Sequence, residues 1–192
     1  VQGAIITKEK VLNYFKLKNK IIKKIREKKI KIIFGENFNK KNLNDYKYVF
    51  ITTYRDNNLV LSNLGIPPKR KFRYELVEKI VVKLPKKYKK VSCVVLDGKF
   101  LCIDPYLGTN FHLLSHVKYS KIKILCAKYY KFFNKNKRML KKEVIKNLDK
   151  SNFKKIVEHG RNYLPFLKDA KYIKSFYLIR VLNLKSMRND DR

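Results

Sequence analysis

The sequence predicts an α+β fold in which a helix precedes an antiparallel sheet. Three observations support this class. A basic stretch near the beginning has apolar residues at helical spacing, the middle consists of short β-rich runs separated by proline and glycine, and a long β-branched and aromatic run lies near the end. With 192 residues, 45% of them hydrophobic, the chain is long and apolar enough to bury a core.

The first predicted element is an amphipathic helix over about residues 8–29, with lysines on its polar side. A short β-branched strand is predicted at 30–34, and the continuous apolar run at 48–51 is typical of a buried strand. The stretch at 65–68, Gly-Ile-Pro-Pro, then interrupts the pattern, because proline restricts the preceding residue and cannot extend a ladder. We place a domain crossing there. The apolar residues of the predicted helix are Val11, Leu12, Phe15, Ile21, Ile22 and Ile25.

Residues 74–124 predict an antiparallel sheet, since short β-rich runs alternate there with turn residues such as Pro85 and Gly108. Asp97-Gly98 lies between the apolar runs 94–96 and 100–103. This dipeptide is a strong hairpin signal, because glycine tolerates a positive φ and aspartate does so better than most residues.

The last part of the chain predicts one helix and one strand. Ser151 offers an N-cap for a helix that carries Phe153, Ile156 and Val157. Residues 172–184 then read as a strand.

The formal net charge of +33 is the most conspicuous feature of the composition. A charge of this size promotes association with phosphate backbones and anionic surfaces. Only nine of the 48 basic residues are arginines, however, and the lysines are spread over the whole length. A joint increase in the frequencies of lysine, asparagine, isoleucine, tyrosine and phenylalanine indicates codon bias. We therefore expect no specific nucleic-acid partner.

Two other classes of function stay open at this point. The segment 128–142 combines lysines with aromatic residues that could stack on bases, as in a lysine-rich nucleic-acid-binding module. The chain could also be a structural fragment without activity. The aromatic residues of the segment are Tyr129, Tyr130, Phe132 and Phe133.

Cysteine and histidine spacing indicates no metal site. Cys93, Cys102 and Cys126 show no C-x-x-C spacing, so they predict neither a zinc site nor a disulfide framework. His112 and His116 would share one face of a strand, but a third ligand is missing nearby.

No run approaches the roughly 20 apolar residues of a membrane helix, and the beginning has no signal pattern. We therefore expect a cytoplasmic protein without a membrane partner. The chain begins at Val1 and ends at Arg192 without a closing element, so we expect it to be part of a longer protein.

Several motifs follow one another in an order that resembles a known family. Two paired β-rich runs at residues 91–105 end in a proline, and a further strand-like run follows at 111–116. Later come a segment with a leucine-proline step at 163–170 and a run that ends in an arginine at 175–180. The last segment, 189–192, has acidic residues followed by an arginine. This order and spacing resemble the D-amino-acid oxidase superfamily, which includes glycine and sarcosine oxidases.

The resemblance implies a Rossmann-like FAD-binding domain joined to an antiparallel-sheet substrate domain. Residues 1–64 would be a partial FAD-binding domain, 65–180 the substrate domain, and 181–192 the return toward the FAD domain. The implied activity is oxidation of an amine or an amino-acid-like small molecule by hydride transfer to FAD. The sequence departs from the family in three features: the G-x-G-x-x-G fingerprint is absent, Val181 stands where a proline is usual, and tryptophan is lacking.

The resemblance also suggests site residues, although it assigns no catalytic residue. Arg180 lies where relatives carry an arginine for the substrate carboxylate, and its planar fork suits that group. The alternative is an ordinary strand arginine paired with an acid. Thr52, Thr53 and Tyr54 follow an apolar run and could approach the flavin, or else bond their own backbone. Tyr106 and His116 are weaker candidates for the substrate side.

Overall fold

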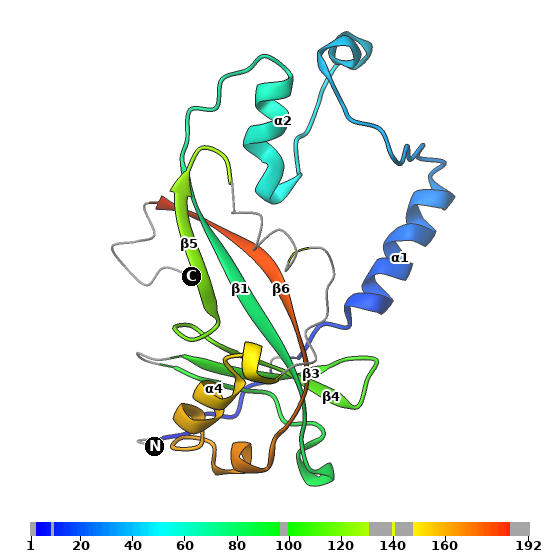
Figure 1. The fold of residues 1–192 in the computed structure, drawn as a ribbon. Helices are drawn as coiled ribbons and strands as arrows, with labels where there is room; N and C mark the ends of the chain where they lie inside the picture. The colour runs from blue at the N-terminus through cyan, green and yellow to red at the C-terminus, as the bar shows by residue number, and fades with distance from the viewer. Residues whose placement is uncertain (1–2, 9, 97–99, 131–139, 141–147, 185–192) are drawn as a thin grey trace. The chain divides into compact units, whose positions relative to one another are not determined.

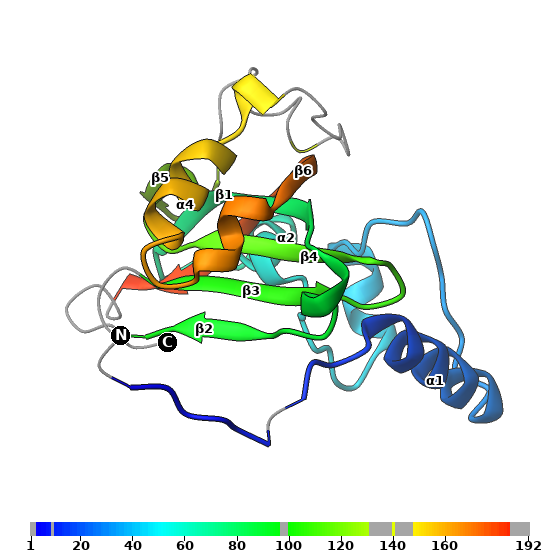
Figure 2. The same cartoon turned by 90° about the horizontal axis from the view of Figure 1, so that it is seen from below.

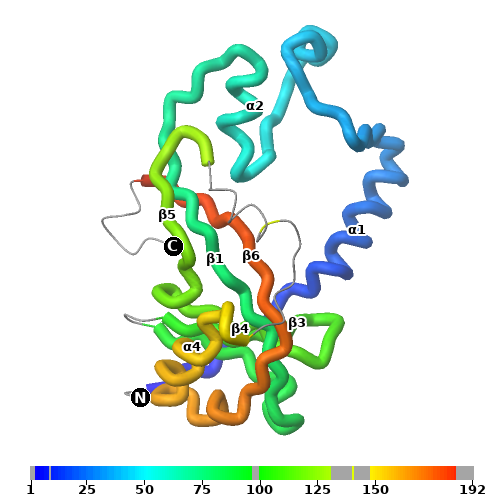
Figure 3. Tube along the Cα trace, viewed as in Figure 1, coloured from blue at the N-terminus to red at the C-terminus, as the bar shows by residue number. Residues whose placement is uncertain are grey.

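The computed structural model describes residues 3–8, 10–96, 100–130, 140 and 148–184 (Figure 1). The chain divides into two compact units. Strands β1 (Phe72–Lys83) and β6 (Lys171–Asn183) each contain residues of both units. Figure 3 traces the course of the chain through these strands. Unit 1 contains Val1–Lys31, Glu78–Ser120 and Lys142–Tyr177. Unit 2 contains Ile32–Val77, Lys121–Lys141 and Leu178–Arg192.

Unit 1 is built on an antiparallel sheet with the strand order β2-β3-β4-β1. The strands β2 (Cys93–Val95), β3 (Leu101–Tyr106) and β4 (Phe111–His116) lie side by side in Figure 2. The predicted pairing of the two runs is confirmed, but the register joins Val95 to Leu101, whereas the predicted two-residue Asp97-Gly98 loop would oppose Val95 to Phe100. Its turn residues Asp97 and Gly98 lie outside the described residues.

The core of unit 1 lies on the face of this sheet that carries the alternate residues Leu101, Ile103 and Leu114, all fully buried. Helix α4 (Phe153–Gly160) and the 3-10 helix η5 (Pro165–Asp169) pack against them. A Cβ at position 160 would lie only 2.7 Å from the side chains of Leu101 and Leu167, so the glycine permits this close approach of α4.

A buried carboxylate fixes the beginning of helix α4. Glu78 on β1 is fully buried, and its Oε1 accepts a hydrogen bond from Ser151 Oγ at 2.6 Å. Its Oε2 accepts one from the backbone amide of Asn152 at 3.1 Å. Asn152, not Ser151, holds the cap position, but Ser151 Oγ does accept the amide of Phe153 at 3.1 Å. A negative charge at this end also suits the helix dipole.

His112 lies on the core face of β4, opposite Val82 and Pro105, and is 1% exposed. Neither ring nitrogen makes a hydrogen bond with acceptable geometry to the residues that the structure describes. Burial lowers the pKa of His112 below its usual 6.5, and nearby backbone groups of Val91 and Tyr88 and the Asp104 carboxylate only partly oppose this. The ring is therefore neutral near pH 7.

In unit 2, strand β5 (Lys121–Ala127) pairs antiparallel with the first half of β1, with a register shift between Leu76 and Val77. Strand β6 also pairs with β1. Helix α2 (Asn57–Asn63) is fastened by the buried amide of Asn58, whose Nδ2 donates to the carbonyls of Arg70 at 2.9 Å and Lys128 at 2.7 Å.

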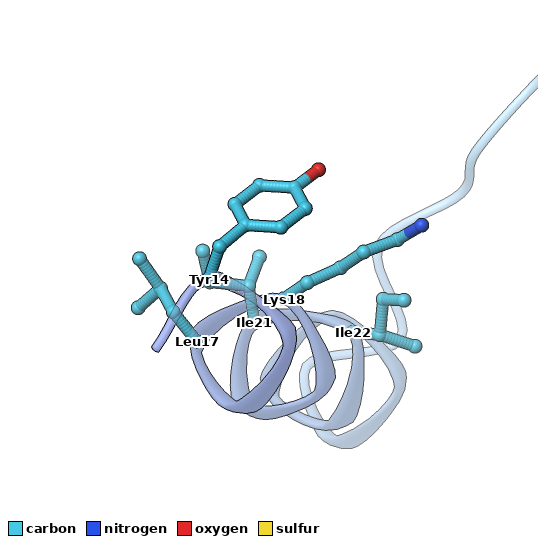
Figure 4. A pocket seen from close by; sticks show the side chains of 5 residues that line it. All are labelled: Tyr14, Leu17, Lys18, Ile21 and Ile22. Carbon is cyan, nitrogen blue, oxygen red and sulfur yellow. The ribbon is translucent and has the colours of Figure 1, made fainter. Parts of the chain in front are cut away.

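The predicted helix near the beginning is confirmed as α1 (Tyr14–Glu27), which starts after the cap residue Asn13. None of its residues is buried. Figure 4 shows Tyr14, Leu17, Lys18, Ile21 and Ile22 along one side of α1, where they line a shallow hollow. Of the residues predicted for the apolar side, Ile21 and Ile22 line this hollow, whereas Val11 and Leu12 precede the helix.

The predicted strands at 30–34 and 48–51 are wrong. Both stretches are extended but unpaired, and Phe34 and Phe50 are 85% and 86% exposed. A buried strand needs neighbouring strands and cover on its faces, and β propensity alone does not supply them. The α+β class is confirmed by the mixed helices and antiparallel strands, whereas the described residues show no Rossmann-like domain. The proposed domains 1–64, 65–180 and 181–192 stay a prediction.

We expect Glu78→Gln to lower the free energy of unfolding by about 1–3 kcal/mol, because it weakens two hydrogen bonds to a buried charged group. Urea denaturation followed by circular dichroism measures this. The matched control is Glu158→Gln, the same change at an exposed position on α4, which should stay within about 0.5 kcal/mol of the wild type. Equal stability of the two variants would contradict the capping role of Glu78.

We also expect His112 to make the protein less stable in acid. Because the folded state lowers the pKa of His112, the unfolded chain binds more protons below about pH 6.5, and the free energy of unfolding falls as the pH drops through this range. The variant His112→Leu should show a shallower fall between neutral and mildly acidic pH. Urea titrations at a series of pH values test this, and an unchanged slope in the variant would refute it.

Candidate functional site

Three strands of unit 2 bring cationic side chains around one buried carboxylate. Arg73 and Glu75 lie two residues apart on β1 and so share a face. Arg180 on β6 donates from Nε to Glu75 Oε2 at 2.9 Å, and its Nη2 donates to the same oxygen. Arg73 Nη2 lies 2.7 Å from Glu75 Oε1, and Lys121 Nζ of β5 lies 3.8 Å from that oxygen.

Burial and charge differ across this cluster. The side chain of Glu75 is fully buried, that of Arg73 is 17% exposed, and that of Arg180 is 40% exposed. One carboxylate faces two guanidinium groups, so the three side chains together keep a positive charge. Arg73 Nε is buried and finds no hydrogen-bond acceptor within the described part of the chain. This arrangement favours an anionic ligand with acceptor oxygens, such as a carboxylate.

Tyr54 is tied to the same strand as Arg180. It begins the 3-10 helix η2 (Tyr54–Asp56), and its hydroxyl oxygen accepts a hydrogen bond from the backbone amide of Val181 at 2.9 Å. Its φ of 57° lies in the left-handed region, which costs a non-glycine residue about 1 kcal/mol or more. The structure therefore joins Tyr54 to the residue that follows Arg180 in β6, 127 positions later in the chain.

Thr52 and Thr53 lie in the same exposed segment as Tyr54. Thr53 Oγ1 donates to Asn57 Oδ1 at 2.9 Å, which satisfies its hydroxyl locally. The segment does not follow a strand, because the run at 48–51 forms none. The assignment of these residues to the flavin side stays a prediction.

Tyr106 and His116 lie in unit 1, at opposite ends of the β3-β4 pair. The register joins Tyr106 to Phe111 and Leu101 to His116. Their side chains point to opposite faces, since His116 shares the core face with Leu101 whereas Tyr106 lies on the other. They do not form one wall of a pocket, and their assignment to the substrate side also stays a prediction.

His116 is engaged by its own turn and by helix α4. Its Nδ1 accepts the backbone amides of Lys118 at 3.1 Å and Tyr119 at 3.2 Å, which places the proton of the neutral ring on Nε2. Nε2 lies 3.2 Å from Nδ1 of His159. Among the described residues, no three side chains of the metal-binding types converge on one point.

Sequence reasoning missed Glu75 and Arg73. The available signal was weak but present: Glu75 is one of only 15 acidic residues in a strongly basic chain, and it stands inside the β-rich run that becomes β1. Arg73 is at the same-face position two residues earlier. The sequence could not show that Arg180, 105 residues later, meets this carboxylate.

The base-stacking interpretation of 128–142 gains no support from Tyr130. Its ring packs against Tyr74, with centroids 5.8 Å apart, and the Arg55 guanidinium lies 5.3 Å from its centre. Phe132 and Phe133 lie outside the described residues. The alternative function, a lysine-rich nucleic-acid-binding module, stays a prediction.

No protein-family model, no curated protein and no solved structure matches this chain. In the part of the chain that the structure describes, no helix combines the length and apolar character needed to cross a bilayer.

We expect Tyr54→Phe to loosen the backbone of β6 at Val181, because the variant removes the acceptor of that amide. Loss of a net hydrogen bond of about 1 kcal/mol should speed hydrogen exchange of the Val181 amide about fivefold. Amide exchange measured by NMR tests this, with Tyr48→Phe at an exposed tyrosine as control. Equal exchange rates in all three proteins would rule out the Tyr54 contact.

Proposed function

We propose that this chain belongs to an FAD-dependent oxidoreductase of the D-amino-acid oxidase type, which oxidises an amine or amino-acid-like small molecule. Arg180 binds the carboxylate of the substrate, and the segment Thr52 to Tyr54 contributes to the flavin side. The sequence motifs supply the class of enzyme, and the structure supplies a test of whether its candidate residues can act together.

The observation that carries the proposal is the hydrogen bond from the Val181 amide to the Tyr54 hydroxyl at 2.9 Å. It joins the segment suggested for the cofactor to the strand that carries the residue suggested for the substrate. The left-handed φ of Tyr54 adds weight, because strained backbone persists where surrounding contacts hold it and clusters at functional sites.

The two arginines near Glu75 favour binding of a substrate that carries a carboxylate group. Arg73 and Arg180 keep one positive charge in excess of Glu75, and Arg180 is exposed enough to meet a ligand. A guanidinium fixes the orientation of a carboxylate through parallel charge-assisted hydrogen bonds, whereas a lysine would act only as a point charge.

The described residues do not form a dinucleotide cradle, since the fingerprint G-x-G-x-x-G is absent from the sequence and no nucleotide-binding fold is described. When bound, FAD would supply the acceptor of the hydride. The residues of this chain would bind and orient the substrate acid.

The test uses the complete protein that carries this chain. We expect visible flavin absorbance after purification or reconstitution, FAD in the supernatant after denaturation, and bleaching of the flavin by an amino acid or secondary amine in the absence of oxygen. A protein that carries no flavin even after reconstitution would refute the proposal.

In that enzyme, Arg180→Lys should lower kcat/KM about 30-fold, because a hydrogen-bonded charge pair contributes about 2 kcal/mol that a lysine does not reproduce in the same geometry. Arg161→Lys, at an exposed position after α4, should leave kcat/KM unchanged. An Arg180→Lys variant with the kcat/KM of the wild type would remove Arg180 from the substrate site.

A further inference from the structure

The guanidinium of Arg180 has two usable edges, and Glu75 contacts only one of them. Nε and Nη2 of Arg180 both donate to the single oxygen Oε2 of Glu75. An arginine carries five N–H donors in a rigid planar fork. The donors at the terminal end of the fork, on Nη1 and the far side of Nη2, therefore point away from Glu75.

The two edges of the Arg180 guanidinium differ in their surroundings. The Nε edge meets a carboxylate that is fully buried, whereas the side chain of Arg180 as a whole is 40% exposed. Because Glu75 already occupies the Nε edge, an incoming ligand would meet the fork at its terminal edge. A bidentate contact with a carboxylate through this edge needs no change in the contact with Glu75.

The carboxylate of Glu75 is itself held in place. Its second oxygen, Oε1, lies 2.7 Å from Nη2 of Arg73, which stands on the same face of β1. Each oxygen is thus ion-paired with a different arginine, although Oε1 makes no hydrogen bond of acceptable geometry within the described part of the chain. Arg73 holds Glu75 by charge, and Glu75 holds Arg180 by charge and by hydrogen bonds.

We propose that Glu75 is a positioning residue, which occupies the Nε edge of Arg180 so that the terminal edge binds the carboxylate of the ligand. This inference rests on the proposed function, because it explains how the substrate arginine is aimed. Without Glu75 the long side chain of Arg180 could offer either edge to an anion, and the ligand would no longer bind in one defined orientation.

The test observes the two edges of Arg180 separately by NMR on the full 192-residue chain, with acetate as the probe. The Nε–Hε signal of Arg180 is assigned by its loss in Arg180→Lys. In the wild type we expect acetate to shift the Nη nitrogen signals of Arg180 and to leave its Nε–Hε signal in place. Acetamide, a neutral molecule of the same shape, should shift neither.

In Glu75→Gln, the Nε–Hε proton should exchange with water about tenfold faster, because a bond to a charged acceptor becomes a bond to a neutral one. Acetate should then shift the Nε–Hε signal as well, since the ligand now reaches both edges. Glu158→Gln, the same chemical change at an exposed site, should behave as the wild type. A merely structural Glu75 would not alter which edge acetate contacts.

The amide spectrum shows whether Glu75→Gln folds. If it does not, Glu75→Asp takes its place, because the side chain is one methylene shorter and loses the contact while keeping its charge. The proposal is overturned if acetate shifts Nε–Hε in the wild type, if it shifts no Arg180 signal, or if the folded variant keeps the wild-type pattern.

The two proposals fail separately. A protein without flavin whose Arg180 takes acetate on the terminal edge would remove the oxidoreductase and keep Glu75 as a positioning residue of an anion site. An active flavoprotein in which acetate reaches Nε–Hε of the wild type would keep the oxidoreductase and remove the positioning role.

Discussion

Burying a carboxylate costs several kcal/mol unless hydrogen-bond donors or cations meet its charge, and strand β1 buries two. Glu75 and Glu78 are both fully inaccessible to solvent, and they stand on opposite faces of the strand. Glu75 is met by arginines in unit 2, whereas Glu78 is met by a hydroxyl and a backbone amide at the start of α4 in unit 1. Each unit therefore contains one buried acid of this strand.

The different partners of these two acids indicate different roles. The groups around Glu78 are neutral and only partly exposed, so their hydrogen bonds serve the fold by fixing where a helix begins. The groups around Glu75 are charged and exceed it in charge, and their side chains range from 17% exposed for Arg73 to 40% exposed for Arg180. In a chain of net charge +33, most cations are dispersed lysines, but the ones organised around an acid are mainly arginines.

Local signals in the sequence identified elements whose determinants are local. Helix α1, the β2-β3 hairpin and strand β6 follow from periodicity, turn chemistry and propensity, and all three are present. The runs at 30–34 and 48–51 have the same propensity but are unpaired, because a strand also depends on neighbours that its own residues do not encode. The same limit applies to Arg180. The sequence suggested that this strand arginine could pair with an acid, but it could not identify Glu75 as the partner, because the two residues lie far apart in the chain. The left-handed φ of Tyr54 had no signal at all, since tyrosine does not favour it.

Constraints on two consecutive residues of strand β6 bear on the binding role that we propose for Arg180. The Val181 amide is held by the Tyr54 hydroxyl, and the Arg180 side chain is held by Glu75. Ordering a free arginine side chain costs about 2 kcal/mol of rotamer entropy, which reduces the affinity for any ligand that must impose that order. Here folding has already fixed both the backbone and one edge of the fork. A ligand that meets the other edge gains the hydrogen bonds without most of that cost, so the pairing of Arg180 with an internal acid is compatible with binding an external one.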